Sequence, residues 1–158
     1  MLKYTGTLIC FREIPDKVTL AINISNCPNH CIGCHSPYLR NDIGTELTDY
    51  ELFNLVDSND GINCICFMGE GRDIPRLVEI MALLKLEYPK IETALYTGSD
   101  EFDETIFNGT LDYLKIGHYD DKYGPLDKET TNQRLYHIVD GKRVDITSLF
   151  WRKPMYEQ

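Results

Sequence analysis

Three cysteines lie within eight residues, in the segment Asn26-Cys-Pro-Asn-His-Cys-Ile-Gly-Cys-His35. Their spacing, C-x3-C-x2-C, can place three thiolates on one tight loop. A cubane iron–sulfur cluster has four irons that each take one further ligand, and cysteine thiolates are the usual ligands. Cys27, Cys31 and Cys34 would bind three irons and leave the fourth open, as a catalytic metal site keeps one position free. The segment therefore predicts a [4Fe-4S] cluster that can bind a small molecule.

A structural zinc site is the alternative, built from the same three cysteines with His30 or His35. Zinc sites usually combine two pairs of ligands separated along the chain, and the sequence shows no second pair of that kind. Cys64 and Cys66 are two residues apart on one face of an expected strand, which is typical of packed core thiols. Cys10 is also expected in the core. The cluster interpretation is favoured.

The cysteine segment resembles the signature of radical S-adenosylmethionine (SAM) enzymes. In that superfamily the open iron binds the amino and carboxylate groups of SAM. One electron from the cluster then cleaves the sulfonium, and the 5′-deoxyadenosyl radical abstracts hydrogen from the substrate. Most members carry an aromatic residue before the third cysteine, whereas this chain has Gly33, which indicates a particular subgroup.

The Cys-x3-Cys-x-Gly-Cys form, the short chain and the tail Thr130-Thr-Asn-Gln-Arg-Leu-Tyr136 together resemble one family. It is the activating enzyme of the anaerobic (class III) ribonucleotide reductase, a relative of the pyruvate formate-lyase activase, and the resemblance spans residues 19–136. It implies an incomplete α/β barrel and an oxidoreductase that leaves a glycyl radical on anaerobic ribonucleoside-triphosphate reductase. The implied cofactors are the [4Fe-4S] cluster and SAM, and the implied electron donor is a low-potential protein such as flavodoxin or ferredoxin.

The same resemblance implies four SAM contacts, and no catalytic residue beyond the cluster ligands. Gly69 and Glu70 match the Gly-Gly-Glu motif of radical SAM proteins, although Met68 replaces its first glycine. Thr97 ends a strand and could border the cofactor pocket, or it could simply be a strand terminus and the cap of the following helix. Lys115 lies in an otherwise apolar strand, where a charge is costly unless paired. It could bind the SAM carboxylate or extend its ammonium to solvent.

Other functions remain open at this point. The chain could activate another glycyl-radical enzyme, act on a small molecule, or serve as a non-catalytic module that binds zinc or a cluster. A radical must be shielded from water, and a short chain has few elements with which to close a lid. A partner protein could supply the missing wall by inserting its glycine loop, so the size of the chain favours a macromolecular substrate.

Length and composition narrow the class of protein further. The 158 residues fit a single domain, 1–158, with 42% hydrophobic and 26% charged residues. A formal net charge of -9 argues against direct binding to nucleic acid. The stretch from Met1 to Phe11 is too short for a secretory signal, and no run approaches the roughly 18 apolar residues of a membrane span. We expect a cytoplasmic protein.

The chain must also provide elements that position these residues, and strand and helix signals alternate along it. Thr48 and Glu51 form a capping box that predicts a helix start, and Asp73 predicts a second. The expected strands are residues 19–24, 62–68, 91–96 and 111–116, with a weak helix at 99–107, a polar loop at 120–131 and a closing hairpin at 134–146. This alternation predicts an α/β fold, an open partial (βα) barrel with a mainly parallel sheet and a C-terminal β-hairpin.

Several polar residues near the C-terminal half receive milder interpretations. His118 and His137 are expected to be surface or network histidines rather than metal ligands. The run Asp100–Glu104 is expected to be a solvated helix start. Asn132, Gln133 and Arg134 belong to the family-like tail, and they could serve the fold, the cofactor or the partner.

Overall fold

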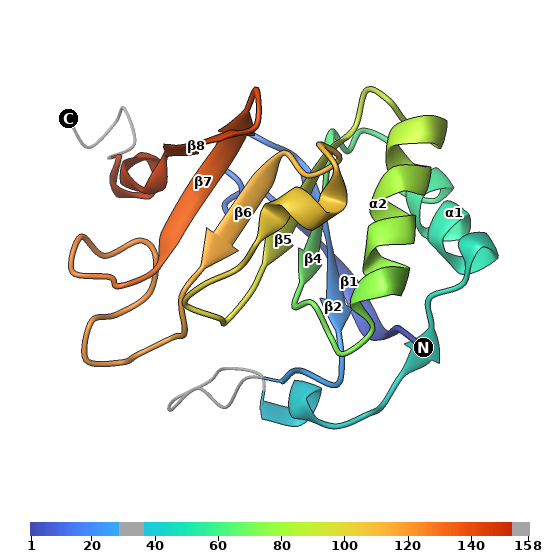
Figure 1. The fold of residues 1–158 in the computed structure, drawn as a ribbon, viewed down its shortest axis with the longest axis horizontal. Helices are drawn as coiled ribbons and strands as arrows, with labels where there is room; N and C mark the ends of the chain where they lie inside the picture. The colour runs from blue at the N-terminus through green and yellow to red at the C-terminus, as the bar shows by residue number, and fades with distance from the viewer. Residues whose placement is uncertain (29–36, 153–158) are drawn as a thin grey trace.

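The computed structural model describes residues 1–28 and 37–152. These residues form one eight-stranded sheet in the order β3-β1-β2-β4-β5-β6-β7-β8 (Figure 1). The strands are β1 (Lys3–Cys10), β2 (Thr19–Ile24), β3 (Thr45–Glu46), β4 (Cys64–Met68), β5 (Glu92–Tyr96), β6 (Tyr113–Ile116), β7 (Arg134–Val139) and β8 (Lys142–Asp145). The α-helices are α1 (Asp49–Asp57) and α2 (Ile74–Glu87), and short 3-10 helices span Pro37–Arg40, Glu104–Phe107 and Thr147–Trp151.

The sheet is mixed. Its four central strands, β2, β4, β5 and β6, are parallel neighbours. On one side β1 runs antiparallel to β2, and β3 runs antiparallel to β1. On the other side β7 and β8 form an antiparallel hairpin against β6, so the predicted C-terminal hairpin is present.

The predicted fold class, an open partial (βα) barrel with a mainly parallel sheet, is wrong. The described chain has an eight-stranded mixed sheet and only two α-helices, which is a different class from a helix-rich barrel. In a (βα) barrel an α-helix follows each strand and connects it to the next. Here the connection from β5 to β6 contains only the 3-10 helix Glu104–Phe107. The flanking strands join by antiparallel pairing, which extends the sheet at both sides and leaves β3 and β8 as its two edges.

The local start signals of both helices are confirmed. Thr48 is the N-cap of α1, and its side chain accepts a hydrogen bond from the Glu51 backbone N–H at 3.1 Å. Asp73 is the N-cap of α2 and accepts from the Arg76 backbone N–H at 3.2 Å. The weak helix expected at 99–107 is reduced to its last turn. Strands β1 and β3 were not predicted.

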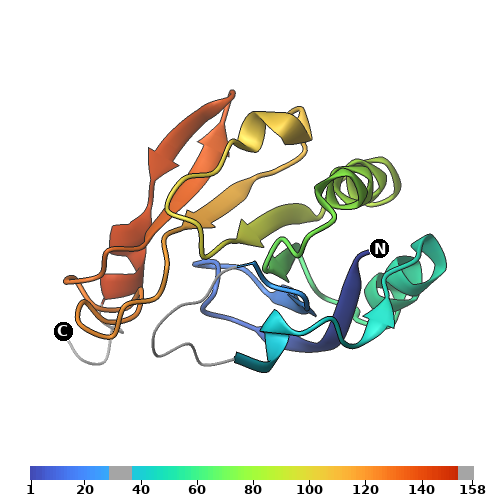
Figure 2. The same ribbon diagram turned by 60° about the horizontal axis from the view of Figure 1, so that its bottom comes forward.

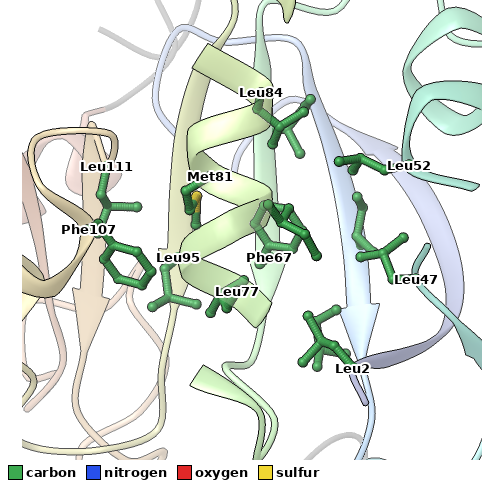
Figure 3. Close-up of a cluster of buried hydrophobic side chains, with 14 of the residues drawn as sticks. Leu2, Leu47, Leu52, Phe67, Leu77, Met81, Leu84, Leu95, Phe107 and Leu111 are labelled. Atoms are coloured by element: carbon green, nitrogen blue, oxygen red, sulfur yellow. The ribbon is translucent and has the colours of Figure 1, made fainter. Parts of the chain in front are cut away.

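One face of the sheet packs against both helices (Figure 2). Leu77, Met81 and Leu84 of α2 project toward Phe67 and Leu95 of the sheet (Figure 3). This follows from the i, i+4, i+7 spacing of the helix, which gathers its apolar side chains on one stripe. Neither helix in the described part of the chain is long and apolar enough to cross a membrane.

The opposite face carries a smaller apolar cluster without an α-helix. Cys64, Cys66, Ala94, Tyr113 and Leu135 are buried there with Ile14, and Phe150 from the last 3-10 helix packs against them. Because side chains alternate between the two faces of a strand, Met68 and Tyr96 also lie on this face. This helix-free face bears the candidate site.

Candidate active site

Four parallel strands end at the same edge of the sheet. Their final paired residues are in register: Asn23 of β2 lies opposite Met68 of β4, Met68 opposite Tyr96 of β5, and Tyr96 opposite Lys115 of β6. In open α/β sheets, ligands bind outside the carboxyl ends of the strands. The loops that follow these four residues therefore form the natural place for a site.

The cysteine segment leaves the end of β2 at this edge. The Asn26 backbone N–H donates to the Asn41 carbonyl at 2.9 Å, and the Cys27 N–H donates to the Leu39 carbonyl at 2.7 Å. The chain therefore returns to within hydrogen-bond distance of Cys27 only twelve residues later. A closed segment of this length suits three thiolates that share one small cluster.

Cys31 and Cys34, the other two predicted cluster ligands, lie at 29–36, outside the described residues. So do His30 and His35, the histidines of the zinc alternative. Within 1–28 and 37–152, no three His, Cys, Asp or Glu residues gather as a metal site. The described cysteine that fits the predicted donor set is Cys27, which is only partly buried.

The Gly-Glu-Gly turn after β4 contacts the strand that leads into the cysteine segment. Gly69 and Gly71 both have positive φ angles, +106° and +63°. A Cβ on Gly71 would lie 3.0 Å from the Ile24 side chain and 3.4 Å from the Ser25 carbonyl oxygen, so glycine allows this approach. The side chain of Glu70 is buried, with 4% exposed. The turn therefore packs against Ile24 and Ser25, which directly precede the cysteine segment.

Thr97 directly follows β5, at the same end of the sheet as Gly69 and Lys115. The Gly69 N–H donates to the Tyr96 carbonyl at 2.8 Å, and the Thr97 N–H donates to the Lys115 carbonyl at 2.9 Å. The Thr97 side chain is fully buried, and its hydroxyl accepts from the Ser99 backbone N–H at 3.0 Å. Thr97 therefore ends the strand and closes the turn after β5, while the N-cap of the next 3-10 helix is Asp103.

Lys115 is buried at the same edge, on the helix-free face, with 7% of its surface exposed. Its ammonium donates to the Gln133 Oε1 at 2.8 Å and to the Gly117 carbonyl at 3.1 Å. The nitrogen also lies 5.4 Å from the centre of the Tyr96 ring, within the range of a cation–π interaction. The ammonium is therefore held in one position and does not extend into solvent.

Gln133 and Gly117 are site residues whose roles sequence reasoning missed. Gln133 is 6% exposed, and its amide fixes the ammonium of Lys115. Gly117 has a φ of +105°, and a Cβ there would lie 3.0 Å from the Gln133 Cα. In the sequence, Gln133 was marked only by its position in the family-like tail 130–136, which gave it no specific role. Only the pairing of β6 with β7 brings the three residues together.

The remaining described cysteines are core thiols, as predicted. Burial raises the pKa of Cys64 to about 12 and that of Cys10 to about 11. Complete burial also raises the pKa of Cys66 well above the ordinary value. All three are therefore protonated near neutral pH and do not present thiolates to a metal. The Cys66 Sγ lies 3.6 Å from the Met68 Sδ.

The two histidines in the described part of the chain, His118 and His137, both contact neighbouring side chains. His118 Nδ1 lies 2.7 Å from Asp100 Oδ1, and this hydrogen bond lowers the pKa of the Asp100 carboxyl. The amide of Asn132 donates to the His118 carbonyl at 3.1 Å, which ties the β7 side of the site to the β6 side. His137 stacks on Tyr113 with ring centres 4.5 Å apart.

A buried ammonium, a glycine turn and the first cysteine of the C-x3-C-x2-C segment follow or end neighbouring parallel strands at the same end of the sheet. An ammonium and backbone N–H groups are the kinds of donor that suit an anionic ligand. No family model, curated protein or solved structure matches the chain.

Proposed function

We propose that the chain is a radical SAM activase that abstracts an α-hydrogen from a glycine of a larger protein and leaves a glycyl radical there. The proposed partner is anaerobic ribonucleoside-triphosphate reductase, and the proposed compartment is the cytoplasm. The observation that carries the proposal is the convergence at one sheet edge of Cys27, the Gly69–Gly71 turn and Lys115. Cys27 would supply a thiolate for the cluster, the glycine turn would supply backbone groups that contact the bound SAM, and Lys115 would pair with the SAM carboxylate.

Cys27, Cys31 and Cys34 would bind the cluster, and the chain returns beside Cys27 at Leu39, which fits a short ligand loop. When bound, the cluster and SAM supply one-electron cleavage of the sulfonium and abstraction of a hydrogen atom. The chain itself orients the bound molecule. The ammonium of Lys115, fixed by Gln133, would pair with the SAM carboxylate, since a charge-assisted hydrogen bond to a prepositioned donor is strong.

The open sheet supports a macromolecular substrate. Its edges are formed by β3 and β8, so the described strands enclose no barrel interior. The loop after β6, residues 120–131, is mostly exposed and borders the candidate site. A glycine loop from a partner protein could therefore reach this edge and exclude water from the reacting atoms.

A reconstitution experiment tests the proposal. The anaerobically purified protein is reduced, mixed with SAM and a candidate reductase, and examined by electron paramagnetic resonance. A glycyl radical on the reductase is the expected result, together with methionine and 5′-deoxyadenosine in the chromatogram. Exposure to air should abolish both, because an open iron leaves the cluster accessible to oxidation.

Metal analysis separates the proposal from its alternatives. Iron with equimolar sulfide supports the activase, whereas stoichiometric zinc and no SAM cleavage would establish a binding module instead. SAM cleavage without a radical on this reductase would redirect the search to another glycyl-radical enzyme or to a small-molecule substrate.

A further inference from the structure

An arginine side chain reaches the cysteine segment from the glycine turn. Arg72 directly follows Gly71, and its Nε–H donates to the Oδ1 of Asn26 at 3.2 Å. Asn26 directly precedes Cys27, the first predicted cluster ligand. The two residues are 46 positions apart in the chain, so they meet only because β2 and β4 pair and end side by side.

The backbone fixes both residues of this contact. Asn26 has a φ of +58°, a left-handed conformation that asparagine adopts more readily than most residues. Its own N–H donates to the Asn41 carbonyl at 2.9 Å. Arg72 stands between the glycine turn and Asp73, the N-cap of α2. The guanidinium therefore has a defined position beside the start of the cysteine segment.

The positive charge of Arg72 is not neutralised within the described part of the chain. The side chain is exposed, and its one hydrogen-bond partner in residues 1–28 and 37–152 is the uncharged amide of Asn26. No carboxylate in these ranges forms an ion pair with it. By contrast, the next arginine along the chain, Arg76, is paired with Asp49 and Glu79. Arg72 thus presents an unpaired cation next to the first predicted ligand.

An unpaired cation at this position has an electrostatic consequence for a bound cluster. Reduction adds one electron, and with it one negative charge, to a cluster whose three thiolate ligands are already negative. The formal net charge of the chain, -9, opposes this step. Net charge is one of the factors that set the reduction potential of an iron–sulfur cluster. A guanidinium beside the ligands therefore favours the reduced form.

We infer that Arg72 raises the reduction potential of the proposed cluster, so that the low-potential electron donor can reduce it more readily. The inference rests on the proposed function, because it requires a cluster at Cys27, Cys31 and Cys34. The electron comes from the donor protein and passes to the cluster. Arg72 neither gains nor loses an electron or a proton, so its role is electrostatic and it does not enter the reaction.

The reduction potential of the anaerobically reconstituted cluster tests the inference, by redox titration followed with electron paramagnetic resonance. Arg72→Gln removes the charge and keeps a side-chain amide. It should shift the reduction equilibrium toward the oxidised cluster at least about threefold, which is a potential lower by about 28 mV for one electron. Lys90→Gln is the matched control and should leave the potential unchanged. Lys90 is exposed and lies two residues before β5, at the opposite end of the sheet.

Two further measurements separate charge from local structure. Arg72→Lys keeps the charge, so its potential should stay closer to that of the wild type than to that of Arg72→Gln. The difference between the wild type and Arg72→Gln should shrink when the salt concentration rises from about 0.05 M to about 0.5 M, because salt screens an exposed charge. A purely structural change at the cluster would persist at high salt.

The inference is overturned if Arg72→Gln and Lys90→Gln give the same potential, if Arg72→Lys falls as low as Arg72→Gln, or if the shift does not respond to salt. Each of these results would leave the proposed function intact, since the cluster is present in every variant compared. A protein that binds zinc, or no iron, would overturn the proposed function and this inference with it. Iron and sulfide are therefore measured first in each variant.

Discussion

At the scale of single residues, the cysteines divide into two chemical groups. Cys10, Cys64 and Cys66 are buried thiols whose pKa values are raised, whereas Cys27 is partly exposed at the candidate site edge. Metals bind thiolates rather than thiols, so burial sets these three core cysteines apart from Cys27, the predicted ligand.

The first prediction concerns cluster ligation. Replacing any one of Cys27, Cys31 or Cys34 by Ala should remove the cluster, because a second iron would lose its protein ligand. Iron and sulfide are measured after anaerobic reconstitution. The control is the double variant Cys64→Ala/Cys66→Ala, which should retain iron. Loss of iron from this control together with a full cluster in Cys31→Ala would disprove the ligand assignment.

The second prediction concerns the buried ammonium. Gln133→Glu places a carboxylate beside Lys115 and should lower affinity for S-adenosylhomocysteine, which has the SAM carboxylate, by about tenfold. Gln133→Met removes the acceptor but adds no charge, so its effect should be smaller. Calorimetric titration gives both dissociation constants. Equal affinity in wild type and Gln133→Glu would show that the ammonium does not bind the ligand.

At the scale of elements, strand ends are joined by contacts that depend on close approach. Gly117 directly follows β6 and lies against Asn132 and Gln133, the two residues before β7. Glu104 of the 3-10 helix Glu104–Phe107 forms an ion pair with Arg143 of β8. Both contacts can be perturbed without touching the hydrophobic core.

The third prediction compares two glycines with positive φ. Gly141→Ala should cost about 1–2 kcal/mol of folding free energy, since its φ is +75° and its surroundings are open. Gly117→Ala should cost more, by about 1–3 kcal/mol, because the new Cβ would press on the Gln133 backbone. Urea unfolding measures both. Equal losses would mean that the 117–133 contact relaxes freely.

The fourth prediction is a pH dependence. Arg143 donates to both carboxylate oxygens of Glu104, at 2.8 and 2.7 Å, and this lowers the pKa of Glu104. A depressed carboxyl pKa contributes stability above the unfolded value, about 4.3, and that contribution is lost as pH falls through the lower folded pKa.

Glu104→Gln should therefore cost about 1 kcal/mol at pH 7 and progressively less as the medium becomes more acidic than about pH 4. The difference in unfolding free energy between variant and wild type is measured across this range. Asp127→Asn is the control, since Asp127 is exposed and has no ion pair with a described residue. A cost for Glu104→Gln that stays constant with pH would contradict the ion-pair explanation.

At the scale of the whole molecule, the fifth prediction concerns docking of the partner. Asp121, Asp127 and Glu129 are exposed on the loop that borders the candidate site. The backbone of this loop is anchored to the last 3-10 helix, because the Trp151 indole N–H donates to the Leu126 carbonyl at 2.9 Å. Neutralising the three carboxylates as Asn, Asn and Gln should therefore leave the loop folded.

This triple variant should reduce glycyl-radical formation on the reductase more than uncoupled SAM cleavage. The reason is that the loop would contact the partner and not the cofactor. Radical yield is measured by electron paramagnetic resonance, and cleavage by the release of 5′-deoxyadenosine. If both activities fall in equal measure, the loop belongs to the cofactor site instead.

Much of the local structure follows from sequence alone. β2 spans the predicted residues 19–24, and Thr48 and Asp73 begin the two helices where their capping side chains predict. Caps and apolar periodicity depend on neighbours within one or two turns, so they are visible in the chain itself. The spacing of Cys27, Cys31 and Cys34 and the core positions of Cys10, Cys64 and Cys66 were likewise read from short stretches of sequence.

Tertiary structure alone decided the rest. The sheet became mixed because β1 pairs antiparallel with β2 and β7 pairs antiparallel with β6, and no periodicity encodes that choice. The Lys115–Gln133 contact joins residues on two strands, so it exists only once β6 and β7 pair. The Arg72–Asn26 contact likewise depends on the parallel pairing of β2 with β4, a property of pairing rather than of any single segment.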